Sequence, residues 1–138
     1  MQICFYIAKY GTSLDKLISA VSFSKYSHCE LLFSDGLCAS ASIRDNSVRF
    51  KRINLNSGRW DIFEFKNITK TESEIRYVVE LLKDEKYDYL GAVASALYLD
   101  FGSENKKYCS EICGYPAVAP GNLTPGALYR YLKKNNKI

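Results

Sequence analysis

The chain has one histidine and no closely paired cysteines. Its 138 residues contain five cysteines and a single histidine, His28, and no two cysteines form a C-x-x-C pair. Zinc sites use histidine and cysteine ligands at short fixed spacings, so we expect no metal and no cofactor. An odd number of cysteines cannot all pair within one chain, and disulfides persist mainly in oxidising compartments. We therefore expect free thiols and a cytoplasmic location.

The sequence also lacks long apolar runs and a strong charge of one sign. No run approaches the roughly 18 residues that span a bilayer, so no transmembrane segment is expected. Residues 1–7 lack the basic stretch and cleavage site of a signal peptide and predict a strand instead. The net charge of +4 is mild. We expect the basic stretch 133–137 to be solvated and frayed, and no nucleic-acid partner. A nucleic-acid binder is a third hypothesis, which predicts strongly salt-dependent binding.

What is present is the composition of one globular domain covering residues 1–138. The chain is 47% hydrophobic and 25% charged, which excludes a disordered class. Alternating and β-branched segments predict strands at 2–8, 27–33, 37–43, 48–53 and 60–65. Helical periodicity and caps predict helices at 14–23, 72–84, about 90–99, from 109 to about 114, and from 125 onwards. Strands that come mainly before helices favour an α+β fold, with an antiparallel sheet or small barrel packed against helices.

Several local signals mark where these elements begin. Ser13 is a candidate cap for the first helix, whose apolar face would include Leu17 and Ile18. Thr71 and Glu74 match a capping box. Thr124 precedes a proline at a first helical position. The three strands between residues 27 and 53 are expected to form a meander.

The main functional signal is the stretch Tyr108-Cys109-Ser110-Glu111-Ile112-Cys113, which follows a polar loop. A cysteine in the first turn of a helix faces unpaired N–H groups and the positive end of the helix dipole. Both favour the thiolate, which is the reactive form. Cys109 is therefore the candidate nucleophile. Cys38 ranks second, because a strand position lacks this field. The plain alternative is that all five thiols are buried and inert.

His28 lies in the second predicted strand. In a strand, residues two apart share a face, so His28 and Glu30 are neighbours, and Cys29 points away from them. Glu30 can accept a ring N–H and fix the tautomer. A hairpin would also bring Ser40 and Ser42 near the ring, so the orienting residue remains open between these three. The plain alternative for His28 is a half-buried ring bonded to backbone.

Together these residues can perform nucleophilic catalysis if the fold brings them together. His28 would accept the thiol proton of Cys109, and the thiolate would attack an acyl carbon to form a thioester. Backbone N–H groups at the start of the cysteine helix could bind the oxyanion. The side chains of Tyr108 and Ser110 are candidate orienting or cleft residues beside the nucleophile.

Four motifs and their order resemble the permuted branch of the NlpC/P60 papain-like superfamily, in particular its YiiX/YebB-like cysteine hydrolases, some of them phage-encoded. The motifs span nearly the whole chain: residues 27–31 (SHCEL), 87–91 (YDYLG), 108–111 (YCSE) and Thr124-Pro125 before the final helix. In that branch the histidine strand comes first and the cysteine helix last. The resemblance implies a nucleophile at Cys109, a base at His28 and an acidic partner at Glu30. It also implies a peptide, amide or acyl-lipid substrate, and a host cytoplasm for a phage-encoded version.

An alternative from another class is a catalytically silent binding module of the same fold. Its aromatic cleft would hold a host protein or a lipid, which suits a chain with 11 tyrosines and 7 phenylalanines. Selective reaction of Cys109 with a thiol-reactive acyl probe distinguishes the enzyme from the module.

Overall fold

The fold is α+β, as expected. The structure, a computed structural model, describes residues 1–83 and 109–138. Its strands are β1 (Gln2–Ile7), β2 (Tyr26–Leu32), β3 (Cys38–Ser42), β4 (Ser47–Lys51) and β5 (Trp60–Glu64). They form one antiparallel sheet of order β4-β3-β2-β1-β5. The expected meander of β2, β3 and β4 is confirmed. Because β4 and β5 end the order, the described strands form an open sheet and not a small barrel.

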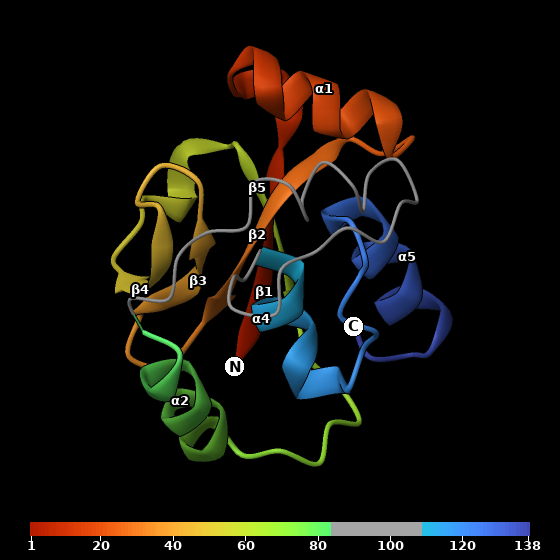
Figure 1. The fold of residues 1–138 in the computed structure, drawn as a ribbon. Coiled ribbons are helices and arrows are strands. Elements are labelled where there is room, and N and C mark those ends of the chain that lie inside the picture. Colours follow the sequence, from red (N-terminus) through yellow and green to blue (C-terminus); the bar gives the residue numbers. More distant parts are fainter. Residues whose placement is uncertain (84–108) are drawn as a thin grey trace.

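The helices surround this sheet on one face and at two ends (Figure 1). They are α1 (Ser13–Val21), α2 (Glu72–Leu81), α4 (Cys109–Gly114) and α5 (Pro125–Lys134), with short 3-10 turns at Ala8–Tyr10, Leu55–Ser57 and Tyr115–Ala117. Figure 1 shows α4 and α5 against one face of the sheet, α1 across one end, and α2 near the other end. The helix expected at about 90–99 lies outside the described residues.

The strand β3 is buried on both faces of the sheet, which accounts for the small size of its residues. All five residues of β3 are buried, and they are small: Cys, Ala, Ser, Ala and Ser. Small side chains let α4 approach β2 and β3 closely. On α5, Leu128 and Leu132 are spaced by one helical turn and are fully buried. Contact with α4 and α5 on one face therefore anchors residues 109–138 to the sheet.

Two expected helix starts are confirmed. The Thr71 side chain accepts from the backbone of Glu74, whose carboxylate accepts in return from the Thr71 backbone N–H at 2.7 Å. Thr124 accepts from Ala127, with Pro125 in the first turn of α5. Both caps satisfy N–H groups that the helix itself leaves unpaired.

The first helix differs from its expectation in two respects. Its cap is Thr12, which accepts from the backbone of Asp15, and Ser13 is already helical. Of its apolar residues Ile18 is buried, whereas Leu17 is 53% exposed. Two adjacent hydroxyl residues offered alternative caps, and the Asp15 carboxylate completes a capping box only with Thr12.

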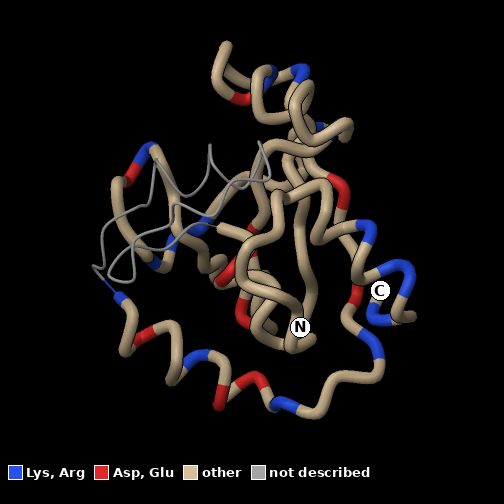
Figure 2. Tube along the Cα trace, turned by 45° about the vertical axis from the view of Figure 1, so that its right-hand side comes forward, with Lys and Arg blue, Asp and Glu red and all other residues tan. Residues whose placement is uncertain are grey.

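The basic stretch 133–137 is largely solvated, as expected, but it is not frayed. Ile138 is buried in the core. The backbone of Lys137 accepts from Lys66 at 2.7 Å, and its ammonium donates to the Asn67 carbonyl at 2.6 Å. Figure 2 shows several Lys and Arg positions near the C-terminus and others spread over the rest of the trace. A terminal apolar residue and backbone pairing therefore tie this segment down.

Within residues 1–83 and 109–138, no helix is long and apolar enough to cross a membrane.

Candidate functional site

The site is built where β2 and β3 separate. These strands pair only at Leu31↔Ala39 and Leu32↔Cys38, although β3 pairs with β4 along its whole length. Beyond the Leu31↔Ala39 pair, the Ser40 hydroxyl donates to the Cys29 carbonyl at 2.8 Å and takes the place of a ladder hydrogen bond. The N–H and C=O of one residue point to the same side in an antiparallel strand. The Cys29 N–H therefore also points into this opening.

Cys109, the first described residue of α4, occupies that opening. Its sulfur accepts hydrogen bonds from the thiol and backbone N–H of Cys29 and from the His28 ring. The hydrogen bond from the Cys29 thiol holds the pKa of Cys109 well below its usual value; burial opposes this, and the charge and hydrogen bond of His28 add to it. The fold thus places the expected nucleophile against the expected base.

The other thiols differ from Cys109 in their electrostatics. Burial raises the pKa of Cys29 and of Cys4, and it raises the pKa of Cys38 to about 11. Each is buried, as is Cys113. The lowered pKa thus favours the thiolate at Cys109, whereas the raised pKa of Cys38 favours the neutral thiol.

His28 is held between the sulfur and a carboxylate. Glu30 Oε1 accepts from His28 Nε2 at 2.8 Å, which leaves Nδ1 as the ring nitrogen for Cys109. Burial disfavours the charged ring, but the charge and hydrogen bond of Cys109, followed by those of Glu30, raise the pKa of His28 to about 10. Both shifts favour the thiolate and the imidazolium over the neutral pair.

Glu30 is 1% exposed and keeps its charge because of Arg49. The guanidinium donates to both carboxylate oxygens at 2.7 Å, a two-bond geometry that strengthens the pair. Burial disfavours the carboxylate, yet the hydrogen bonds from Arg49 and then His28 hold the pKa of Glu30 below its usual value. Arg49 also donates to Asp45 at 2.8 Å, and Lys51 donates to the same carboxylate at 2.9 Å.

Sequence reasoning missed Arg49, although a signal for it exists. Along β4, Val48 is fully buried and Phe50 packs against the core. Arg49 therefore faces the opposite side of the strand, which is the side of His28 and Glu30. A carboxylate on a central strand requires a cation, and the meander places β4 within reach.

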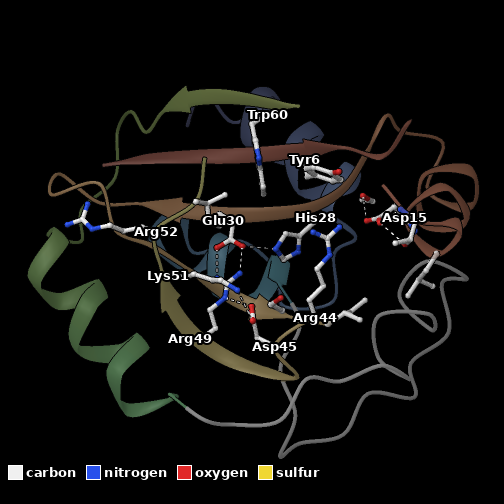
Figure 3. A pocket seen from close by; sticks show the side chains of 16 residues that line it. Tyr6, Asp15, His28, Glu30, Arg44, Asp45, Arg49, Lys51, Arg52 and Trp60 are labelled. Atoms are coloured by element: carbon white, nitrogen blue, oxygen red, sulfur yellow. Dashed lines mark hydrogen bonds and ion pairs between the residues drawn. The ribbon is translucent and has the colours of Figure 1, made fainter. Parts of the chain in front are cut away.

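A cleft of about 300 Å³ opens on this face of the sheet. Figure 3 shows His28 and Glu30 pointing into it from β2, with α4 and α5 behind the sheet. Trp60 and Tyr6 line it and pack edge to face, with ring centroids 5.0 Å apart. The Trp60 ring centroid lies 6.3 Å from that of His28. The cleft thus offers aromatic surface beside the base.

Ser40 and Ser42 were candidate orienting or cleft residues, and Ser42 does line the cleft. The Ser40 hydroxyl is occupied by the Cys29 and Ala41 carbonyls, and Ser42 hydrogen-bonds Asp45. Within the described chain, neither serine hydrogen-bonds His28, because the opening between β2 and β3 redirects them. Ser110 donates to the Leu123 carbonyl and ties α4 to the following loop. Tyr108 lies outside the described residues.

Strict alternation fails at one neighbour of His28 and holds at the other. A register shift between β1 and β2 opposite Tyr6 and Ile7 makes Ser27 the extra residue of a bulge. Ser27 consequently lines the same cleft as His28 and donates to Asp15 at 2.8 Å. Cys29 points away from His28 and Glu30, as expected: it lies in the buried core, where it contacts Cys109.

Comparison of the chain with protein-family models, curated proteins and solved structures finds no significant match. Among the described residues, no group of three His, Cys, Asp or Glu side chains is arranged to hold a metal ion.

Proposed function

We propose that this chain is a cysteine hydrolase or acyltransferase that cleaves an amide or ester bond through a thioester. Cys109 is the nucleophile, His28 the proton carrier, and Glu30 the residue that orients the ring. The observation that carries the proposal is the hydrogen-bonded contact of the Cys109 sulfur with His28, with the pKa of the thiol lowered and that of the ring raised. The buried Glu30–Arg49 pair supports it, because it holds the imidazole in one orientation.

The reaction follows from these positions. The Cys109 thiolate attacks the acyl carbon, and the His28 imidazolium gives its proton to the leaving amine or alcohol. Water, or another acceptor, then loses a proton to His28 and attacks the thioester. This step releases the acyl product and restores the Cys109 thiolate beside the His28 imidazolium. Backbone N–H groups at the start of α4 are proposed to bind the oxyanion. Glu30 accepts from Nε2 through both half-reactions, so that Nδ1 remains the nitrogen that exchanges protons with the reactants.

The fold proposal is the permuted branch of the NlpC/P60 papain-like superfamily. A histidine strand that precedes a cysteine helix in the chain, and contacts it in space, supports that order of elements. Peptides, amides and acyl lipids are its proposed substrates, without a metal or other cofactor.

The test is labelling by a thiol-reactive acyl probe at pH 6–7, read by mass spectrometry of the intact chain and its peptides. One label on Cys109 is expected, and it should disappear in Cys109→Ala and His28→Ala. Cys38→Ala serves as the matched control and should label normally. Cys109→Ala should abolish turnover while its Tm stays within roughly 5 °C of the native value, since it removes about 1 kcal/mol. Full turnover by Cys109→Ala would exclude the assigned nucleophile.

The second candidate is a catalytically silent binding module that holds a protein or lipid in the aromatic cleft. The burial of Cys109, which is 2% exposed, favours this candidate. It predicts that the acyl probe reacts with no cysteine in preference to another, and that Cys109→Ala binds its partner as well as the native chain does.

A further inference from the structure

The carboxylates that line the cleft are all neutralised or hydrogen-bonded by the protein itself. Glu30 binds Arg49 and His28, and Asp45 binds Arg49 and Lys51. Asp15 accepts from Thr12 and Ser27, at 2.7 and 2.8 Å. Each carboxylate of the described cleft is therefore engaged within the protein, two of them by cationic side chains.

Arg44 is different. It is an exposed residue of the β3–β4 turn that lines the cleft. Its guanidinium carbon lies 5.9 Å from the centroid of the Tyr6 ring. Among residues 1–83 and 109–138, no carboxylate is in ion-pair contact with it. Asp15 interacts with it only at longer range.

The position of Arg44 links it to the reacting pair. Tyr6 is directly opposite His28 across β1 and β2, so a guanidinium over the Tyr6 ring lies next to the base. Figure 3 shows the Arg44 side chain rising from its turn toward His28. Arg52 also lines the cleft, but it lies at the far side in that view and donates to the Asp35 carbonyl at 3.0 Å.

We propose that Arg44 binds a carboxylate or phosphate group of the substrate, while the apolar part of the acyl group packs on Tyr6 and Trp60. An exposed guanidinium that pairs with no carboxylate of residues 1–83 and 109–138 matches such an oxyanion. The aromatic pair beside it supplies apolar surface within reach of His28. The anion-binding part of this inference stands on the cleft alone; the assignment as substrate group rests on the proposed hydrolase function.

Trp60 gives a direct binding readout, because it is the only tryptophan of the chain and lines the cleft. Its fluorescence is followed while glutarate or glycerol 3-phosphate is added at constant ionic strength. Saturable binding of at least one anion is expected. Arg44→Gln should weaken it about tenfold, Arg44→Lys should restore part of it, and Arg52→Gln should leave it unchanged.

The two anions distinguish the sources of the recognised group. Tighter binding of glutarate indicates a peptide-like carboxylate, and tighter binding of glycerol 3-phosphate indicates a lipid-type phosphate. No saturation by either anion, or equal affinity in Arg44→Gln and the native chain, overturns the inference.

An activity measurement separates this inference from the hydrolase proposal. The p-nitrophenyl esters of butyrate and of glutarate (as its mono-ester) differ in one acyl carboxylate. The native chain should prefer the anionic ester, and Arg44→Gln should lower that preference about tenfold, mainly through KM. Arg44-dependent anion binding without hydrolysis of either ester would reject the hydrolase and keep the anion site. Hydrolysis with a preference that Arg44→Gln does not change would reject the anion site and keep the hydrolase.

Discussion

Replacing Arg49 by methionine tests whether the site depends on a buried, compensated carboxylate. Glu30 is 1% exposed, and Arg49 supplies two hydrogen bonds of 2.7 Å to it. Methionine keeps much of the volume of the side chain and removes the charge. The variant leaves Glu30 with His28 as its one remaining partner among the described residues, since Asp45 and Lys51 do not contact it.

The size of the effect follows from the burial of Glu30. Removing one partner of a buried ion pair costs about 3–5 kcal/mol, because an uncompensated charge is left behind. A domain of this size is stable by roughly 5–15 kcal/mol, so Arg49→Met should lose a large part of its unfolding free energy. A Tm decrease of about 10–15 °C is expected.

Urea denaturation monitored by the fluorescence of Trp60 measures this loss. Arg52→Met is the matched control: it removes an exposed arginine of the same cleft and should cost less than about 1 kcal/mol. In the double variant Glu30→Gln/Arg49→Met no buried charge is left, so the double variant should be more stable than Arg49→Met alone.

The pH dependence supplies a second signature. In the native chain the pKa of Glu30 is lowered, so its stabilisation is present above the unfolded pKa of 4.5 and is lost as the pH falls below that value. In Arg49→Met burial is no longer opposed by the guanidinium, and the pKa of Glu30 should rise. The stability gap to the native chain should then narrow as the pH falls from 7 to 5. A gap at pH 7 no larger than that of Arg52→Met, or a gap that widens on acidification, would refute the reasoning.

Two further predictions concern the nucleophile and a helix cap. Cys29→Ala removes the thiol hydrogen bond to Cys109, so the midpoint pH for alkylation of Cys109 by iodoacetamide should rise. The control Cys38→Ala should leave this midpoint unchanged. An unchanged midpoint in Cys29→Ala would show that the Cys29 thiol does not stabilise the Cys109 thiolate. Thr71→Ala removes the side-chain cap of α2 and should lower the unfolding free energy by about 1 kcal/mol. Thr71→Ser retains the hydroxyl and should lose less. Equal losses in the two variants would argue against the cap.

Much of the fold was predictable because its signals are local. Alternation located the strands, and the side chains of Thr71 and Thr124 marked helix starts within three residues of the groups they bind. Local signals failed where neighbours compete or where distant chain segments meet. Thr12 lies three residues before Asp15, a capping-box spacing that sequence reasoning missed, and the C-terminal segment is held by a backbone bond to Lys66.

For the candidate site, residue type and spacing pointed to Cys109, His28 and Glu30. The thiol lies at a predicted helix start, and the histidine lies two residues from a carboxylate in a predicted strand. Spacing could not show that β2 and β3 separate after two residue pairs and admit the sulfur beside Cys29. It also did not reveal Arg49. Charge compensation of a buried group depends on which strands become neighbours, and that is decided by packing of the whole sheet. The sequence by itself determined the elements and the chemical groups; the tertiary structure alone decided which groups touch, because hydrogen bonds and ion pairs act over a few ångströms between residues far apart in the chain.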